Sequence, residues 1–443
     1  LTKNGEGDLV VMDMETYAYI NYLKELVEEG KVDESVIDDA VRRILKVKFE
    51  LGLFEDPFRY ADKQREEELL YHPEHQEIVL DMAKRSIVLL KNDPALLPLD
   101  KNQSNIAVIG DLADDKNSPL GSWRIGSDDN TAVSVLEGLD SAGLKYTYAK
   151  GADLAIGETN FITEVQINES DTSGFAEARD VAKDAEIVIM VLGEHGFQSG
   201  ESRSRTELGL PGVQQQLLET VFEVNSNIVL VLMNGRPLAI PWADEHIPAI
   251  LETWHLGTQS GNAIAQVLLG DYNPSGKLPM TFPRSVGQVP IYYNHFNTGR
   301  PESEGLIFWS HYIDESNAPL YPFGYGLSYT EFQYSNLEID ASDNENIIVS
   351  TEVTNTGSRV GEEVVQLYIR DKVASVARPV RELKGFEKIM LQPGETRKVT
   401  FTLTDNELGF YDNDGNYITE PGEYDVMVGT NSQEGLKGSF VRQ

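Results

Sequence analysis

The sequence predicts a multidomain α/β protein that ends in an all-β domain. Between residues 77 and 269, helical periods alternate with short apolar strands, a pattern typical of a mostly parallel sheet with helices on both faces. From Phe332 onward the period changes to two, with turn signals between the strands. The chain of 443 residues is long enough for two or three domains.

The first 55 residues are predicted to be helical. One helix covers Glu15 to Glu29 and stops at Gly30, and Asp33 can cap the next. The apolar stripe of the second helix consists of Ile37, Val41, Ile44, Val47 and Leu51. Two amphipathic helices without a sheet cannot bury both apolar faces alone, so we expect them to need an upstream partner. Residues 56–75 are polar and are predicted to be an irregular linker.

Residues 76–290 are predicted to form the α/β domain. Its helices are expected at 77–91, 131–142, 174–183, 211–224 and 258–269. Its strands are expected at Ile106–Ile109, Tyr146–Ala149, Ile187–Leu192, Ile228–Met233 and Ile250–Trp254. The remainder, 271–290, is rich in proline and glycine and is predicted to be loop.

Residues 291–331 are aromatic and irregular, and we interpret them as a strap lying on other domains. Residues 332–443 predict an immunoglobulin-like or fibronectin-like β-sandwich. The string Asp412–Asn416 faintly resembles a calcium loop, but Tyr417 occupies the position that requires glycine, so a hairpin turn is favoured.

Composition excludes several classes of function. A formal net charge of −35 argues against nucleic acids and anionic membranes as partners, because binding phosphate requires a positive surface. The chain has no cysteine, which excludes disulfides, thiolate metal sites and cysteine nucleophiles. No apolar run is long enough to span a membrane. Neither a G-x-S-x-G elbow nor a nucleotide-binding glycine motif occurs, and the histidines do not have metal-ligand spacing, so no cofactor is expected.

The most informative stretch is 188–210. A buried strand ends at Gly193, and a polar loop follows with two carboxylates, Glu194 and Glu201, between glycines. Open α/β sheets place their chemistry in such loops, at the carboxyl ends of strands. The other interpretation is two solvated acids in a mobile loop. His195 could form an acid–base pair with Glu194, although a histidine facing solvent is favoured.

Several strings identify a family that the chain resembles. R-R-I-L-K-V-K-F-E-L-G-L-F-E-D-P (42–57), L-L-G-D-Y-N-P-S-G-K-L-P-M-T-F-P-R (268–284) and Y-P-F-G-Y-G-L-S-Y-T (321–330) are similar to glycoside hydrolase family 3, and most closely to its periplasmic β-glucosidases. The resemblance implies a (β/α)8 barrel, a linker, an α/β sandwich and a fibronectin type III-like domain. It makes residues 1–55, with V-M-D-M at 11–14, the carboxyl-terminal end of the barrel.

The resemblance also implies a chemistry. Such enzymes hydrolyse terminal β-linked sugars with retention, using one carboxylate as nucleophile and another carboxyl as acid and base. Ser199-Gly200-Glu201 with Arg205 is similar to the acid/base motif, so Glu201 is the candidate and Glu194 the alternative. Trp123 in G-S-W-R resembles the aromatic residue that stacks on the sugar in the +1 subsite, with Arg124 beside it; a packing tryptophan is the other interpretation.

The nucleophile motif of the family, S-D-W or S-D-Y, does not occur in this sequence. We therefore expect a fragment that supplies the acid/base, requires the upstream barrel and is inactive alone. A β-glucoside or oligosaccharide is the expected substrate, in the periplasm or outside the cell. A β-xylosidase, an exo-β-glucanase and a non-catalytic carbohydrate-binding or scaffold fragment remain alternatives, and the sequence is compatible with a homodimer.

Overall fold

The computed structural model describes residues 2–3, 6–7, 14–103, 105–301 and 306–443, in two compact units, 1–73 and 74–443. In the first unit the short strands β1 (Thr2–Lys3) and β2 (Glu6–Gly7) pair, and the helices α1 (Met14–Glu28) and α2 (Glu34–Glu50) follow. Asp33 caps α2 by accepting a hydrogen bond from the amide of Ser35, as predicted. Residues 11–13 of the V-M-D-M string lie outside the described residues.

Helix α2 buries none of its residues within its unit. Its stripe residues Val41, Ile44 and Val47 are each about half exposed. The segment 56–75 was expected to be irregular, and this was wrong in part. It contains the helix α3 (Lys63–Leu69), because Asp62 accepts hydrogen bonds from the amides of Gln64 and Arg65 and so caps a run of good helix formers.

The second unit contains a six-stranded sheet of order β3-β8-β7-β6-β4-β5. Its strands are β3 (Val88–Asn92), β4 (Ile106–Ile109), β5 (Tyr146–Ala149), β6 (Ile187–Gly193), β7 (Ile228–Met233) and β8 (Ala249–Glu252). All neighbours run parallel except β3 and β8, so the sheet is mostly parallel, as predicted.

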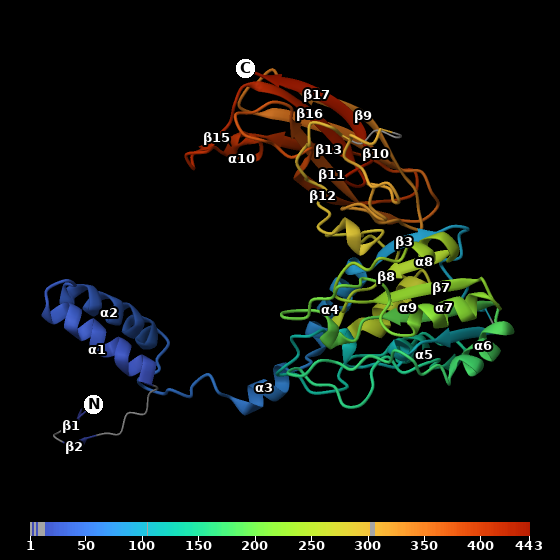
Figure 1. The fold of residues 1–443 in the computed structure, drawn as a ribbon, viewed down its shortest axis with the longest axis horizontal. Coiled ribbons are helices and arrows are strands. Elements are labelled where there is room, and N and C mark those ends of the chain that lie inside the picture. The colour runs from blue at the N-terminus through green and yellow to red at the C-terminus, as the bar shows by residue number, and fades with distance from the viewer. Residues whose placement is uncertain (1, 4–5, 8–13, 104, 302–305) are drawn as a thin grey trace. The chain divides into compact units, whose positions relative to one another are not determined.

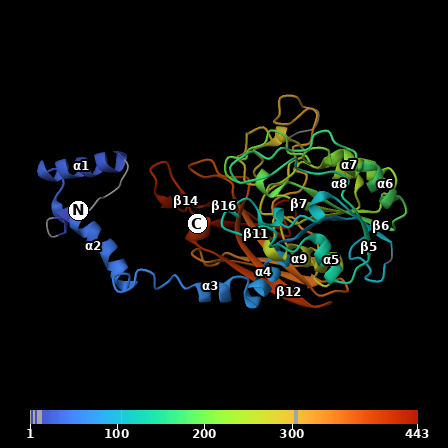
Figure 2. The same ribbon diagram turned by 90° about the horizontal axis from the view of Figure 1, so that it is seen from below.

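Helices cover both faces of this sheet (Figures 1 and 2). On one face pack α4 (Pro73–Ser86), α5 (Val135–Ser141) and α9 (Ser260–Leu268), and on the other α6 (Phe175–Lys183), α7 (Gln214–Phe222) and α8 (Pro241–His246). Single 3₁₀ turns lie at Asp111–Ala113, Ser118–Leu120, Gly196–Gln198, Gly257–Gln259 and Val286–Gln288.

The prediction of one helix over 77–91 was wrong. The helix α4 ends at Ser86, and the buried run Ile87–Leu90 forms the antiparallel edge strand β3 instead. Four consecutive apolar residues without a polar face suit a strand covered on both sides better than an amphipathic helix. The short helix α8 was not predicted.

The last domain is a β-sandwich of a three-stranded sheet, β13-β10-β9, and a four-stranded sheet, β12-β11-β16-β17, which confirms the predicted architecture. Its strands are β9 (Phe332–Asp340), β10 (Ile347–Asn355), β11 (Gly361–Asp371), β12 (Glu382–Leu391), β13 (Thr396–Leu403), β16 (Gly422–Gly429) and β17 (Leu436–Arg442), with α10 (Asp405–Leu408) after β13. Residues 412–416 connect β14 (Phe410–Tyr411) to the antiparallel β15 (Tyr417–Ile418), which confirms the hairpin.

The aromatic segment 291–331 contacts both domains of this unit. Leu327 forms a β-bridge with Leu89 of the α/β sheet, and Phe296 forms one with Pro379 of the sandwich. The two domains also contact each other directly, because Arg85 of α4 pairs with Glu362 of β11 at 2.7 Å.

Candidate active site

Four loops gather at the carboxyl edge of the sheet. The strands β4, β6, β7 and β8 run parallel and in this spatial order β8-β7-β6-β4, so the loops that follow them emerge on one side. These loops carry Trp123 and Arg124, then Glu194 to Arg205, then Asn234 to Arg236, and finally Trp254 and His255. The structure therefore brings together all four predicted site residues in neighbouring loops.

Glu194 is completely buried, and its carboxylate is fully used by the protein. Its Oε1 lies 2.8 Å from Nη1 of Arg205 and 2.9 Å from Nε of Arg236. Its Oε2 accepts a hydrogen bond of 3.3 Å from the amide of Gly235. A buried carboxylate that is paired with two guanidiniums has a structural role and offers no free oxygen to a ligand.

Arg203 and Arg236 form a backbone clasp on the loop that contains Glu201, and Arg236 is also one of the two ion-pair partners of Glu194. Arg236 donates through Nη2 to the carbonyls of Gln198 and Arg203, at the two ends of the loop. Arg203 in turn donates to the carbonyl of Phe197 at 2.7 Å and to that of Glu201 at 2.8 Å. The backbone of the loop is thus fixed from inside the protein through its carbonyl groups.

The side chain of Glu201 takes no part in this clasp. It is exposed, and its carboxylate makes no hydrogen bond or ion pair with any residue that the structure describes. The next residue, Ser202, has a φ of 60°, which turns the chain sharply after Glu201. Glu201 and Glu194, only seven positions apart, therefore have opposite environments: one carboxylate is free and the other is locked.

The Glu201 loop lies directly against the loop of Trp123. Gly200 has a φ of 116°, and a Cβ atom there would lie 2.4 Å from Oγ of Ser122 and 4.0 Å from Nε1 of Trp123. Only glycine satisfies both the dihedral angle and this close approach. The glycine of the string Ser-Gly-Glu is thus explained locally, since it lets the backbone of the Glu201 loop approach the loop of Trp123.

Trp123 forms the exposed end of an aromatic row. Its side chain is 63% exposed, and its ring centroid lies 5.8 Å from that of Phe161, which lies 6.2 Å from that of Phe197. Arg124 lies over Phe197 at 4.6 Å and pairs with Asp129. Trp123 presents a free ring face, whereas the guanidinium of Arg124 is mostly covered, with a side-chain exposure of 11%.

Beneath these loops lies a layer of buried polar groups. Glu252 accepts hydrogen bonds from Asn234 at 3.0 Å and from the amide of Trp254 at 2.9 Å, and burial raises the pKa of Glu252 to about 8. Burial also lowers the pKa of His255 to about 4, so this histidine is neutral at ordinary pH. Both groups favour the uncharged form because they are removed from water.

The interpretation of His195 as a solvent-facing residue was wrong. It is only 9% exposed, and its Nδ1 accepts a hydrogen bond of 3.1 Å from the amide of Phe197. Because both oxygens of Glu194 are bound elsewhere, no acid–base pair forms between these neighbours. Burial lowers the pKa of His195, and the ring serves to cap the 3₁₀ turn at Gly196–Gln198.

Among the residues of this site that sequence reasoning missed are Arg236, Phe161 and Arg203. Arg236 follows strand β7, so the rule that parallel strands end at one edge could have pointed to it. Phe161 belongs to an irregular segment and Arg203 has no distinctive pattern, so no sequence signal marked either. Within the described residues, no three histidine, aspartate or glutamate side chains are placed to hold a metal ion, and no helix is both long and apolar enough to cross a membrane.

Comparison with known proteins identifies the family. The model of the glycosyl hydrolase family 3 C-terminal domain matches residues 87–329, which is more than half of the chain. The chain belongs to glycosyl hydrolase family 3. A fibronectin type III-like model matches residues 363–432 in the sandwich. The family resemblance noted in the sequence is therefore confirmed.

Family 3 relatives match almost the whole chain. The periplasmic β-glucosidase of Salmonella typhimurium is 43% identical over 97% of this chain and 59% of its own length. A β-xylosidase of Formosa agariphila is 40% identical over 96% of this chain and 58% of its own length. The structure of a β-glucosidase from Listeria innocua in complex with isofagomine has a TM-score of 0.85 and 36% identity, and covers 96% of this chain and 57% of that one. The chain thus spans less than two thirds of the length of these relatives.

Proposed function

We propose that this chain is the acid/base-bearing part of an exo-acting, retaining β-glucosidase of family 3, which removes terminal β-D-glucosyl residues. One observation carries the proposal: Glu201 is a free carboxylate on a loop that the protein holds rigidly, beside an exposed tryptophan. The names of the Salmonella and Listeria relatives support glucose as the sugar. The family match supports the class of reaction.

In this mechanism Glu201 acts twice. As an acid it donates a proton to the glycosidic oxygen while a second carboxylate attacks the anomeric carbon; as a base it then takes a proton from the water that hydrolyses the glycosyl intermediate. The backbone clasp by Arg203 and Arg236 supports this role, because a proton donor must be held within hydrogen-bond reach of the leaving oxygen. Glu194, the alternative acid, serves instead as the anchor of that clasp.

We propose that the second carboxylate comes from a (β/α)8 barrel, of which residues 1–55 are the carboxyl-terminal helices. The exposed apolar stripe of α2 supports this, since such a face requires a partner. The 443-residue chain alone should then not turn over aryl β-glucosides, because Glu201 offers acid catalysis but no covalent glycosyl intermediate can form without the nucleophile. Saturable hydrolysis by the purified chain would contradict this division of roles.

We assign Trp123 to the +1 subsite, where its free ring face would stack on the leaving-group sugar. Arg124 would contribute by fixing Phe197 and so the wall behind the tryptophan. Trp123→Ala should weaken binding of disaccharides more than that of small aryl glucosides. Equal losses for both would indicate a packing role instead.

A β-xylosidase is the second candidate, because the Formosa relative of that name is 40% identical. A panel of aryl β-glucosides and β-xylosides, assayed on this chain joined to a family 3 barrel, separates the two. The glucosidase proposal predicts the higher kcat/KM for the glucoside. We also propose a periplasmic location, on the name of the Salmonella relative; cell fractionation tests it.

A further inference from the structure

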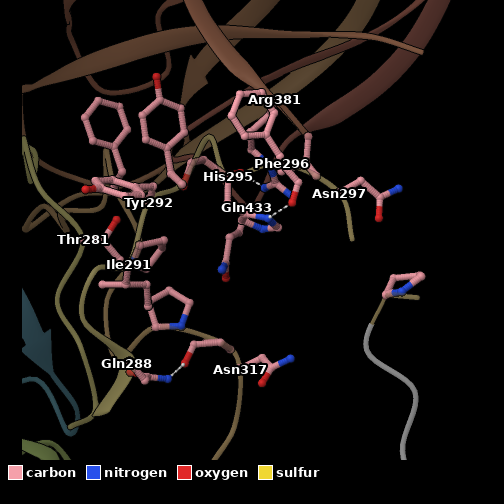
Figure 3. A pocket seen from close by; sticks show the side chains of 18 of the residues that line it. Thr281, Gln288, Ile291, Tyr292, His295, Phe296, Asn297, Asn317, Arg381 and Gln433 are labelled. Carbon is pink, nitrogen blue, oxygen red and sulfur yellow. Dashed lines mark hydrogen bonds between the residues drawn. The ribbon is translucent and has the colours of Figure 1, made fainter. Parts of the chain in front are cut away.

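A cavity lies where the aromatic segment meets the edge of the β-sandwich (Figure 3). It has a volume of about 990 Å³, which is the size of an oligosaccharide or other small-molecule site. One wall comes from residues within 281–301 and 310–323, and the other from Arg370 of β11, Arg381 before β12 and Gln433 before β17. It shares no residue with the loops of Trp123 and Glu201.

The charge of this cavity is opposite to that of the protein. The whole chain has 72 acidic residues against 37 basic ones. Yet none of the described residues lining the cavity is an aspartate or glutamate, whereas two are arginines and two are histidines. A cavity lined by two arginines and by no described carboxylate attracts small anions, so it indicates an anionic ligand.

Both arginines have unused hydrogen-bonding capacity. Arg381 donates to the carbonyl of Ser432, and Arg370 makes no ion pair with any carboxylate that the structure describes. Burial lowers the pKa of Arg381, and the nearby positive charge of Arg370 acts in the same direction. A guanidinium presents donors that match a carboxylate or sulfate, so an anion here would satisfy both side chains.

Aromatic rings stand beside this charged end. Tyr292 is 63% exposed and Phe296 59%, and Figure 3 shows Phe296 next to Arg381. Tyr293 stacks on Phe323 with ring centroids 4.2 Å apart, which stiffens the wall behind them. Exposed rings beside a few polar groups suit a ligand with an apolar face and hydroxyl edges, such as a sugar ring.

The cavity is formed without a ligand. The amide of Val380 donates to the carbonyl of His295 at 2.9 Å, which fixes the segment to the sandwich. On the far wall, Gln288 donates to the carbonyl of Ser316 at 2.7 Å. Binding would therefore not require these walls to become ordered, which lowers its entropic cost.

We propose that this cavity binds an anionic saccharide, with its carboxylate or sulfate facing Arg370 and Arg381 and its ring against Tyr292 or Phe296. The site is separate from the proposed glucosidase chemistry. It would hold the protein on an acidic polysaccharide or recognise acidic units of a substrate.

Isothermal titration of the 443-residue chain tests this with matched probes. Cellobiouronic acid and cellobiose differ by one carboxylate, and cellobiose 6-sulfate replaces it with a sulfate. We use the Trp123→Ala background to suppress binding at the proposed +1 subsite. The charged sugars should bind at least tenfold more tightly than cellobiose, and salt should reduce this preference. Equal affinity for charged and neutral sugars would overturn the proposal.

Variants locate the binding. Arg370→Gln and Arg381→Gln should each lower affinity for both charged sugars at least tenfold and leave cellobiose unaffected. Arg397→Gln, an exposed arginine of the same sandwich, is the matched control and should change nothing. Loss of the hydrogen bond to Ser432 could impair folding of Arg381→Gln. The affinity of Arg370→Gln then tests the proposal by itself, because Arg370 makes no such bond. Unchanged affinity in Arg370→Gln would contradict the proposal.

A comparison with inorganic sulfate provides a further test. Inorganic sulfate that binds as tightly as cellobiose 6-sulfate would show an anion site without sugar recognition and would contradict the proposal.

Discussion

Replacing Glu194 by glutamine should destabilise the α/β domain far more than the same change at Glu201. Glu194 is fully buried and holds two guanidiniums at 2.8 and 2.9 Å, so the variant leaves Arg205 and Arg236 without a counter-charge. Removing one partner of a buried ion pair costs roughly 3–5 kcal/mol. Because the arginine side chains are 18% and 20% exposed, water can partly replace the carboxylate, and we expect about 3 kcal/mol, at the lower end of that range.

Urea unfolding followed by tryptophan fluorescence measures this cost. Three of the four tryptophans, Trp123, Trp242 and Trp254, lie in the α/β domain, so the signal reports mainly on it. Glu201→Gln is the matched control and should stay within about 0.5 kcal/mol of the parent, because the side chain is exposed and unpaired. Hydrogen exchange should also speed up at residues 198–203 in the Glu194 variant alone. Equal stability of the two variants would refute the assignment of Glu194 as the anchor.

The remaining predictions concern pH and the subsite. Burial raises the pKa of Glu252 to about 8 from an ordinary 4.5, so between these values the folded state keeps a proton that the unfolded state loses. The free energy of unfolding of the domain should therefore fall as pH rises from about 5 to 8. Urea titrations at several pH values measure this slope, and Glu252→Gln should flatten it. An unchanged slope would mean that Glu252 is ionised when folded. Trp123→Ala should weaken disaccharide binding to the barrel-joined chain by roughly 1–3 kcal/mol, by analogy with other aromatic stacking platforms, as inhibition constants would show.

Local sequence patterns predicted most strands of the α/β sheet. The strands β4, β5 and β7 have the predicted bounds, because short runs of apolar, β-branched or aromatic residues bounded by glycine or polar residues leave little choice of structure. The same rule failed at Ile87–Leu90, where an apolar run adjoining a helix could continue as either element. The decision came from Leu251 and its neighbours in β8, which provide a partner strand that no local pattern reveals.

The chemistry of the two glutamates depends on tertiary contacts. The sequence placed Glu194 and Glu201 in one loop at a strand end, and could not distinguish a locked carboxylate from a free one. Arg236 helps to lock the Glu194 carboxylate. It lies 42 positions after Glu194 and reaches it only because β6 and β7 are adjacent. The cavity beside Arg370 and Arg381 escaped prediction for the same reason, since these arginines meet the aromatic segment only in the folded protein.

The central claim is that Glu201 donates the proton, and leaving-group dependence tests it most directly. In the chain joined to a family 3 barrel, Glu201→Gln should slow cellobiose hydrolysis by about 10²–10⁴-fold but slow formation of the glycosyl intermediate from dinitrophenyl glucoside far less. Azide needs no base, so it should restore turnover of the activated substrate and yield β-glucosyl azide. If these signatures appear with Glu194→Gln and not with Glu201→Gln, the assignment of the two carboxylates is reversed.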